Sequence, residues 1–464
     1  MTARPFRLFA SVIVSAALAP APEQRAAEET SGGAPRPNFL VLVADDLRHD
    51  TLGFSGHSLL RTPHIDRLAQ EGVVFRNAFV TTSICCVSRA SIFAGQSAQR
   101  HRIYDFATEF ASGAWAKTYP ALLRAAGYRT GFIGKFGVGN VMPEREFDFW
   151  RGFPGQGAYF REGDSRHLTA RMGDQAIEFL RSGDTRPFCL SVSFKAPHAE
   201  DQAPREFAPD PRDEALFADI EVPVPLKAGD ARFAEALHWS VRASEGGKRW
   251  RRRFSTPALW QKTTKDYLRL VAGIDREVGR VVEELEARGL LSNTVVLFSS
   301  DNGFFLGERG LSDKWYPYEE SIRVPLVIVD PRRSSGHRGR TIDPIALNID
   351  IAPTLLDLAG IAAPVEMDGR SLRPLLEGRE TAWRDGFYYD HRTLPELIVP
   401  CEAFRTEQWK VIEWSPSGGH VVELYDLKDD PAEERNLASD PRHQETMSTL
   451  SKRLLEARGA RPAR

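Results

Sequence analysis

Short runs of apolar residues alternate along the chain with amphipathic segments. The runs at residues 38–44 and 294–301 are typical of strands buried on both faces, and both close on acidic side chains. Further strands are predicted at residues 73–80, 129–133, 188–194 and 324–329. Helices are predicted at residues 64–71, 120–126, 168–181 and 265–288, and one more begins near Cys85. Strands that alternate with helices predict a layered α/β sheet.

The pattern changes beyond about residue 378. Strand-like runs follow at residues 386–390, 403–414 and 421–427, and a C-terminal helix closes the chain. This change predicts a smaller C-terminal α+β subdomain. The expected organisation is a leader at residues 1–27, a linker at 28–37, an α/β domain at 38–378 and the subdomain at 379–464.

The leader has the order of a secretory signal peptide. Arg4 and Arg7 precede an apolar run at residues 8–18, and small residues follow that run. A secreted or periplasmic protein is therefore expected, with an uncleaved N-terminal anchor as the alternative. No later stretch approaches the length that crosses a bilayer, so no stable membrane insertion is expected.

Composition excludes two classes of protein. A chain of 464 residues that is 42% hydrophobic and 27% charged can bury a full core, which excludes a disordered protein. Its 61 Lys and Arg residues are balanced by 63 Asp and Glu residues, so no global basic field attracts nucleic acid. Function must therefore be sought in local sites.

Polar side chains at the ends of the two buried strands form the first candidate site. Asp45 and Asp46 follow the first strand, and Asp301 and Asn302 end the second. Ligands of open α/β sheets collect outside the carboxyl ends of the strands, so these side chains are expected to meet there. Hard oxygen ligands suit Ca²⁺ or Mg²⁺ better than zinc. Each acid taken singly is also compatible with a helix cap or a surface charge.

The cysteines provide a second candidate. Four cysteines are too few for a disulfide framework in a chain this long: Cys85, Cys86, Cys189 and Cys401. Neighbouring cysteines rarely bridge each other, so one of the adjacent pair is a candidate for chemistry, and two small buried hydrophobes are the alternative. Arg89 lies on the same helix face as Cys85, and the first turn of that helix attracts a tetrahedral oxyanion. Lys135 and Lys314 would complete a cationic shell, and His198 would supply a general acid, unless they are ordinary polar residues.

Several motifs occur together in this order. The run Cys85-Cys-Val-Ser-Arg89 precedes Ala-Ser-Ile-Phe-Ala-Gly95, and the others are Ala44-Asp-Asp46, Thr62-Pro-His-Ile-Asp-Arg-Leu68, Ser300-Asp-Asn-Gly303, Asp313-Lys314 and Tyr318-Glu-Glu-Ser-Ile-Arg-Val-Pro325. With these motifs the chain resembles the formylglycine-dependent sulfatases of the alkaline phosphatase superfamily over nearly its whole mature length. Near the end, Glu423-Leu-Tyr-Asp-Leu427, Asp430-Pro431 and Asn436-Leu437 are similar to the terminal domain of that family. The resemblance implies a large mixed sheet sandwiched by helices, as in alkaline phosphatase.

The resemblance also implies a role for each matching residue. Cys85 would be oxidised to formylglycine (3-oxoalanine), whose hydrate attacks sulfur with one hydroxyl and expels sulfate with the other. Arg89 would hold the nucleophile, Lys135 and Lys314 would bind sulfate, and His198 would bind substrate and protonate the leaving alcohol. The implied ligands of a Ca²⁺ or Mg²⁺ ion are Asp45, Asp46, Cys85, Asp301 and Asn302. The implied partners are a sulfated small molecule or glycan as substrate and a formylglycine-generating or sulfatase-maturing enzyme. A sulfated carbohydrate is the expected substrate, and the sequence leaves a polysaccharide, a monosaccharide, an aryl ester and choline sulfate open.

This chain departs from the family at two positions. Val87 stands where the modifying enzyme usually meets Pro or Ala, and Gly137 stands where the family often has a sulfate-contacting His. His101 or His391 would be needed to compensate for that His, although ordinary packing roles are expected for both. Cys86 cannot replace Cys85, because the residue four positions after it is Ala90.

Two further segments have open interpretations. The basic run at residues 248–253 would attract a polyanionic glycan or a membrane surface, and a solvated loop is the simpler interpretation. Tyr388, Tyr389 and His391 either shape the pocket of the leaving group or pack within a strand. Two rival functions also remain: a phosphodiesterase or phosphonate monoester hydrolase of the same superfamily, and a silent protein that binds sulfated ligands.

Overall fold

The computed structural model describes residues 1–2, 35–333, 336, 338–416 and 419–459. Most of the expected signal peptide and linker lies outside the described residues. Contacts group residues 36–464 into one unit and residues 1–35 into another.

An eight-stranded mixed sheet forms the centre of the larger unit. Its strand order is β11-β2-β10-β7-β1-β6-β4-β5. The central strand β1 (Asn38–Asp45) runs parallel to both neighbours, β6 (Phe188–Pro197) and β7 (Thr294–Ser300). β10 runs antiparallel to β7, which makes the sheet mixed. The other strands of this sheet are β2 (Val73–Phe75), β4 (Arg129–Lys135), β5 (Phe149–Phe153), β10 (Leu326–Val329) and β11 (Arg340–Ile342).

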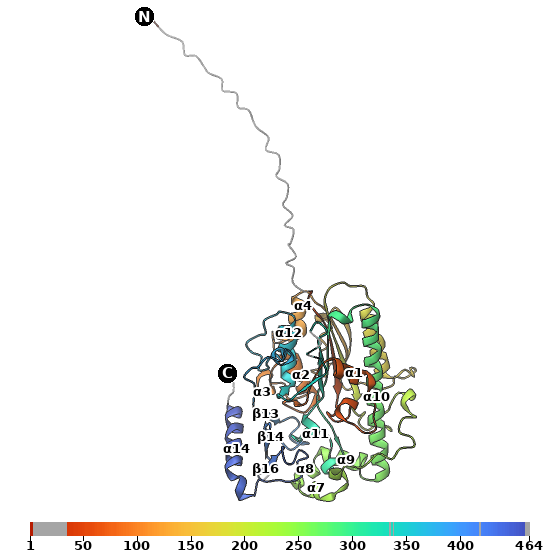
Figure 1. The fold of residues 1–464 in the computed structure, drawn as a ribbon, viewed down its shortest axis with the longest axis vertical. Helices are drawn as coiled ribbons and strands as arrows, with labels where there is room; N and C mark the ends of the chain where they lie inside the picture. The colour runs from red at the N-terminus through yellow and green to blue at the C-terminus, as the bar shows by residue number, and fades with distance from the viewer. Residues whose placement is uncertain (3–34, 334–335, 337, 417–418, 460–464) are drawn as a thin grey trace. The chain divides into compact units, whose positions relative to one another are not determined.

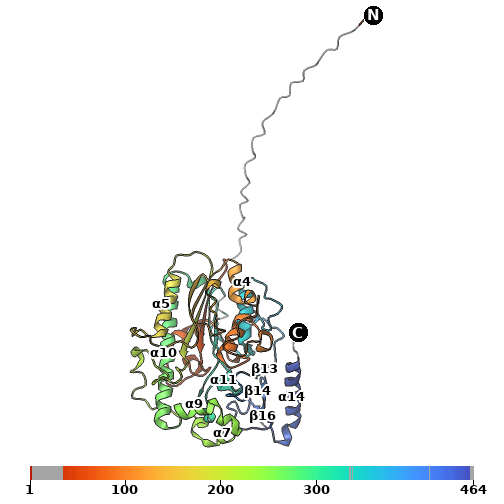
Figure 2. The same ribbon diagram turned by 180° about the vertical axis from the view of Figure 1, so that it is seen from behind.

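Helices cover both faces of the sheet (Figures 1 and 2). Alternate residues of β1 belong to two separate cores: Leu40 and Leu42 to one, Phe39 and Val41 to the other. The first core is covered by α1 (Pro63–Glu71), α5 (Leu168–Leu180) and α10 (Pro257–Ala287). The second core is covered by α2 (Cys85–Ala94), α4 (Tyr119–Ala125) and α12 (Ile351–Leu358). Burial on both faces explains why the central strands are continuously apolar, and the predicted fold class is confirmed.

A smaller antiparallel sheet follows near the C-terminus. Its four strands are β13 (Gly386–His391), β14 (Cys401–Thr406), β15 (Trp409–Trp414) and β16 (Val421–Asp426), in that order. Leu450 and Leu454 of α14 (Gln444–Gly459) pack against Phe404, Val411 and Leu424 of this sheet. The predicted α+β subdomain is therefore present, and its boundary at residue 378 stays a prediction.

The remaining helices and strands are short. They are α3 (Ala98–His101), α6 (Leu226–Gly229), α7 (Ala231–Glu235), α8 (Trp239–Ala243), α9 (Glu245–Arg253), α11 (Glu319–Ile322), α13 (Arg373–Leu376), β3 (Ala78–Phe79), β8 (Phe305–Leu306), β9 (Ser312–Asp313) and β12 (Ala346–Leu347). No helix in the described part of the chain is long and apolar enough to span a membrane.

Four predicted elements are wrong in detail. The strand at residues 73–80 is two strands, because a turn at residues 76–77 sends β3 to pair with β12 in a separate sheet. The run at residues 403–414 is a hairpin of β14 and β15. α10 begins at Pro257 instead of residue 265, since the Thr256 side chain caps it by accepting a hydrogen bond from the backbone N–H of Leu259. The basic run at residues 248–253 belongs to α9 and is not a solvated loop.

Candidate active site

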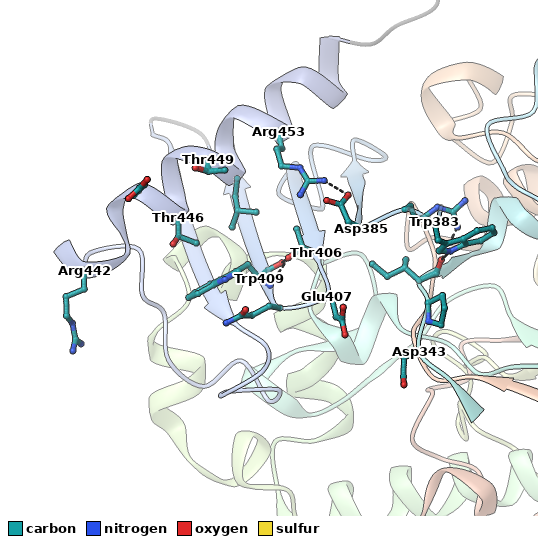
Figure 3. A pocket seen from close by; sticks show the side chains of 16 residues that line it. Asp343, Trp383, Asp385, Thr406, Glu407, Trp409, Arg442, Thr446, Thr449 and Arg453 are labelled. Atoms are coloured by element: carbon teal, nitrogen blue, oxygen red, sulfur yellow. Dashed lines mark hydrogen bonds and ion pairs between the residues drawn. The ribbon is translucent and has the colours of Figure 1, made fainter. Parts of the chain in front are cut away.

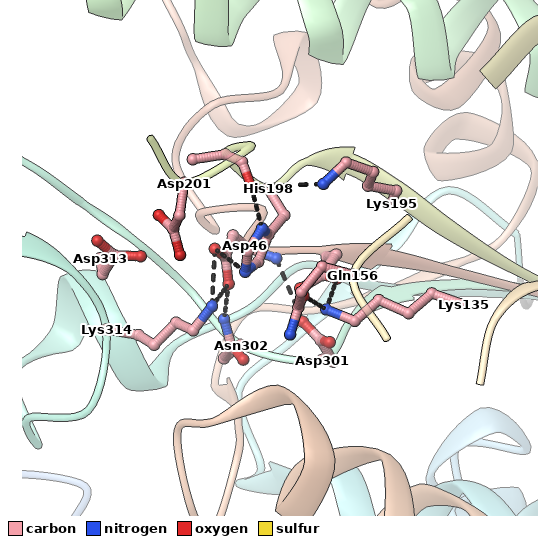
Figure 4. Close-up of polar contacts among 12 residues, drawn as sticks. Asp46, Lys135, Gln156, Lys195, His198, Asp201, Asp301, Asn302, Asp313 and Lys314 are labelled. Carbon is pink, nitrogen blue, oxygen red and sulfur yellow. Dashed lines mark hydrogen bonds and ion pairs between the residues drawn. The ribbon is translucent and has the colours of Figure 1, made fainter. Parts of the chain in front are cut away.

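The acidic side chains at the two strand ends converge. Asp45 is the last residue of β1 and Asp46 follows it, while Asp301 and Asn302 follow the neighbouring parallel strand β7. Carboxylate oxygens of Asp45, Asp46 and Asp301 lie within 4.8 Å of one another. Figure 4 shows Asp46, Asp301 and Asn302 at the same edge of the sheet. The structure thus brings together residues that are more than 250 positions apart in the sequence.

This cluster fits a hard divalent cation. Its four side chains are fully buried, and Asp45 Oδ1 and Asn302 Oδ1 have no hydrogen-bond partner among the described residues. Burial raises the pKa of Asp46 to about 7, despite the opposing charge of Lys314. Burial and the charge of Asp45 also raise the pKa of Asp301. Carboxylate and amide oxygens gathered in one buried place are the ligands that suit Ca²⁺ or Mg²⁺.

Cys85 lies beside this cluster at the first position of α2. It is 1% exposed, and its sulfur lies within 4.8 Å of ligand atoms of Asp45 and His198. Burial raises the pKa of the Cys85 thiol, so an unmodified side chain would be a weak nucleophile. Cys86 is fully buried in the apolar core, which agrees with a packing role. None of the four cysteines forms a disulfide in the described part of the chain.

Arg89 connects α2 to three strands of the sheet. Its Nε donates to Asp301 Oδ2 at 2.8 Å, and its guanidinium also donates to the backbone oxygen of Lys135 at 2.7 Å and to Ser193 Oγ. Because Asp301 follows β7, Lys135 ends β4 and Ser193 lies in β6, one side chain fixes the helix N-terminus against the strand ends.

Two buried lysines hold the carboxylates. Lys135 Nζ lies 2.5 Å from Asp45 Oδ2, and Lys314 Nζ lies 2.6 Å and 2.8 Å from the two oxygens of Asp46. Burial would raise the pKa of Asp45, but Lys135 and Arg89 lower it to about 2. The structure therefore brings Cys85, Arg89, Lys135 and Lys314 together with the acidic residues, as predicted.

His198 faces Asp46 from the turn after β6. Its Nδ1 lies 2.6 Å from the carbonyl oxygen of Ala199, and its Nε2 lies 3.8 Å from Asp46 Oδ2. A carbonyl only accepts, so we assign the ring proton to Nδ1 and a free lone pair to Nε2. Burial and the lysines around it hold the pKa of His198 well below its usual value. The predicted general acid is thus in the site, and its Nε2 must gain a proton before it can donate one.

Two polar residues in the site were not predicted. Gln156 Oε1 accepts a hydrogen bond of 2.6 Å from Lys135 Nζ, and Gln156 lies between two glycines of positive φ, Gly155 and Gly157. Lys195, three residues before His198, is 1% exposed, and its Nζ lies 3.4 Å from the carbonyl oxygen of Ala199. Lys195 could have been found from the sequence, because it lies three residues before His198. Nothing in the local sequence distinguishes Gln156.

His101 and His391, which could have compensated for the histidine that Gly137 replaces, have other roles. His101 interacts with Ser91 Oγ at 3.0 Å and accepts from the backbone N–H of Ile103, and His391 is fully buried within β13. Tyr389 donates from its hydroxyl to the backbone oxygen of Trp315 at 2.5 Å. It therefore braces the loop that carries Lys314. Tyr388 donates instead to Glu402 on the adjacent strand β14, two positions from its own register partner Phe404.

Gly137 fits a position that a side chain would disturb. Its φ is +75°, and a Cβ there would lie 2.8 Å from Cδ of Arg89. Gly137→Ala is expected to lower the free energy of unfolding by about 2–4 kcal/mol, because a left-handed backbone and overpacking both cost energy. Denaturant unfolding measures this loss. Gly113 is the matched control, because it has the same φ and no neighbour within 4 Å of its Cβ position. Gly113→Ala should cost only about 1–2 kcal/mol, and equal losses would contradict the contact with Arg89.

A large cavity in the described part of the chain lies elsewhere. Its volume is about 840 Å³, and it lies between α14 and the ends of β14 and β15, where Trp383, Trp409 and Arg453 line it (Figure 3). None of the converging residues lines this cavity. The chemistry of the buried cluster, and not cavity size, therefore marks the candidate active site.

Comparisons with known proteins agree with this geometry. Residues 37–361 match the family model described as Sulfatase, and residues 307–460 match that of N-sulphoglucosamine sulphohydrolase, C-terminal. An N-acetylglucosamine-6-O-sulfatase of Bacteroides thetaiotaomicron is 30% identical over 87% of this chain and 82% of its own length. N-sulphoglucosamine sulphohydrolase of Homo sapiens is 28% identical over 90% of this chain and 89% of its own.

Solved structures extend the likeness to the fold. A protein in complex with its substrate D-glucosamine-2-N,6-O-disulfate is 28% identical and has a TM-score of 0.81, over 92% of this chain and 98% of the other. A phosphonate monoester hydrolase of Agrobacterium radiobacter is 23% identical with a TM-score of 0.78, over 92% and 96% of the two chains. At that identity the second likeness concerns the fold alone.

Proposed function

The chain belongs to the sulfatase family and is a sulfuric ester hydrolase, and we propose that it removes sulfate from a sulfated carbohydrate with a formylglycine formed from Cys85. The observation that carries this proposal is the position of Cys85, at a helix N-terminus beside three converging carboxylates. The first turn of a helix and the buried lysines would suit the tetrahedral oxyanion of a sulfate ester.

The substrate class is supported by the named relatives. Two of them are named for sulfated glucosamines, and a third was solved with a disulfated glucosamine. For this chain we therefore propose a sulfated carbohydrate, with a glucosamine sulfate as the first compound to test.

The cation site is proposed to hold Ca²⁺, with Mg²⁺ as the alternative. Asp45, Asp46, Asp301 and Asn302 would supply its oxygen ligands, together with the side chain formed from Cys85. A cation in this position supplies charge that stabilises the sulfate oxygens. Asp45 Oδ1 and Asn302 Oδ1 support this assignment, because neither has a hydrogen-bond partner among the described residues.

The chain's own residues would bind and orient the ester. A formylglycine hydrate supplies one hydroxyl for attack on sulfur and a second hydroxyl for release of sulfate. Arg89 holds the N-terminal turn of α2 against Asp301. Lys135 and Lys314, which contact Asp45 and Asp46, would also offer their ammonium groups to the sulfate oxygens. His198 would pass a proton from Nε2 to the leaving alcohol, while Ala199 keeps Nδ1 in place.

Export and maturation complete the proposal. The order of residues in the leader supports a secreted or periplasmic location. Cys85 and all other residues of α2 are buried, so a formylglycine-generating or sulfatase-maturing enzyme would need the segment before it folds.

Sulfate release from matched esters tests the function. We expect aldehyde-bearing protein to cleave glucosamine sulfates with a kcat/KM at least about tenfold above that for the matching phosphate esters, which corresponds to about 1.4 kcal/mol of activation free energy. Ion chromatography of released sulfate and phosphate gives both rates. A preference for phosphate or phosphonate esters would favour the superfamily alternative. Ligand binding without any release would instead indicate a silent binding protein.

A further inference from the structure

The basic run at residues 248–253 contacts two segments beside the candidate site through Arg249 and Arg253. It lies in α9, where Gly246 and Gly247 are buried against neighbouring segments. Arg253 is 2% exposed, whereas Arg251 of the same helix is exposed. The run therefore has an inner and an outer side, and its inner arginines face the loops of the site.

Lys314, which binds Asp46, sits in a strained loop. The residues on both sides of it, Asp313 and Trp315, have φ values of +74° and +84°. Residues other than Gly rarely adopt these angles, and such strain persists only where surrounding contacts hold it. The position of the Lys314 ammonium therefore depends on what holds its two neighbours.

Two arginines of α9 hold the residues around Lys314. Arg249 donates to Asp313 Oδ1 at 3.0 Å, and its guanidinium lies 5.3 Å from the centroid of the Trp315 ring. Arg253 donates to Asp313 Oδ2 and, at 3.1 Å, to Ser312 Oγ. Burial would raise the pKa of Asp313, but the two arginines lower it to about 2, so the carboxylate keeps its charge.

The same arginines hold the loop that carries His198. Arg249 lies 3.0 Å from Asp201 Oδ2, and Arg253 lies 2.7 Å from Asp201 Oδ1. Asp201 follows His198 by three residues, and Figure 4 shows Asp201 and Asp313 close to Lys314. Each arginine thus pairs with two acidic residues, Asp313 beside Lys314 and Asp201 in the loop of His198. A lysine has a single ammonium and lacks this planar fork.

We propose that Arg249 and Arg253 are positioning residues that set Lys314 for the sulfate by joining its loop to the loop of His198. This inference depends on the proposed function, in which Lys314 binds the sulfate group. Arg249 and Arg253 touch no reacting atom themselves, so their effect on catalysis passes through Lys314 and its neighbours.

Variants of Arg249 provide the test, since its side chain is 17% exposed and its removal disturbs the core less than removal of Arg253. In full-length aldehyde-bearing protein, Arg249→Gln and Arg249→Lys are each expected to lower kcat/KM for a sulfate ester by about 10- to 100-fold, the effect of a small misplacement of a binding group. Arg251→Gln removes the same charge from the exposed side of α9 and should stay within about twofold of the parent. Thermal unfolding of each variant checks that it is folded. If Arg249→Gln does not fold, Arg249→Lys is the variant compared with the parent.

A double-mutant cycle separates positioning from general support of the fold. In a Lys314→Met background, Arg249→Lys is expected to change kcat/KM by less than about twofold, because the group that it positions is gone. The inhibition constant of inorganic sulfate should rise in Arg249→Lys and stay unchanged in Arg251→Gln. The inference is wrong if the parent is active and Arg249→Lys has the same kcat/KM. It is also wrong if Arg249→Lys causes its full loss of kcat/KM in the Lys314→Met background. An inactive parent would instead count against the proposed function.

Discussion

Cys85→Ala is expected to lower sulfate release by a factor on the order of 10⁴ or more, the size of effect seen when a nucleophile is removed from a preorganised site. Cys85 is the only cysteine among the four with its sulfur in the described cluster of Asp45 and His198. Alanine cannot form the aldehyde, so no hydroxyl nucleophile remains next to the carboxylates. The measurement is ion chromatography of sulfate released from a glucosamine sulfate.

Cys86→Ala is the matched control. Cys86 is the next residue, is equally buried and loses the same atoms, but its side chain packs in the apolar core. We expect it to lose stability of about 1–2 kcal/mol and to keep kcat within a few-fold of the parent. Equal losses of activity in the two variants would show that the segment as a whole matters and that Cys85 has no special role.

Mass spectrometry of the peptide that contains Cys85 tests the modification itself. Conversion replaces the CH₂SH group with CHO, so the peptide loses H₂S and gains one oxygen atom. Active protein in which this peptide carries only the unmodified thiol would contradict the proposed nucleophile. The result matters for this chain because Val87 replaces the residue that the modifying enzyme usually meets.

The strand-end part of the site could be predicted because its signal is local. A continuous apolar run followed by Asp45 and Asp46, and a second run followed by Asp301 and Asn302, identify two buried strands and the edge at which they end. Their adjacency follows from the general behaviour of α/β sheets, and the register of β1 with β7 agrees with it. The mixed sheet and its covering helices could be predicted for the same reason.

The role of α9 could not be predicted from the sequence. The sequence of a basic run does not show which of its side chains face inward. Here this depends on Asp201, Glu206 and Asp313, which the fold brings next to α9. The break within residues 73–80 had the same cause. β2 and β3 are both apolar, and the turn at residues 76–77 sends them to different partner strands.

Asp45→Asn is the second change with a large expected effect. It keeps the shape of the side chain and removes the charge that lies against Lys135, so kcat/KM is expected to fall on the order of 10²- to 10³-fold, as when a preorganised charge is lost from a dry site. The bound divalent cation, measured by elemental analysis of purified protein, should fall in parallel. Asp50→Asn is the matched control, because Asp50 pairs with Arg48 on the same loop and is not one of the converging acids.

Removal of the cation from the unmutated protein separates loss of the metal from damage to the fold. A chelator should abolish activity and lower the thermal midpoint, because a cation at 100 times its Kd stabilises the folded state by about 2.7 kcal/mol. Added Ca²⁺ should restore both in the parent and in Asp50→Asn but not in Asp45→Asn, whose ligand set is incomplete. Full activity in chelated protein that contains no divalent cation would refute the metal assignment. Asp45 Oδ1 and Asn302 Oδ1, which have no hydrogen-bond partner among the described residues, would then need another partner. A substrate hydroxyl or a bound water would be the next candidate.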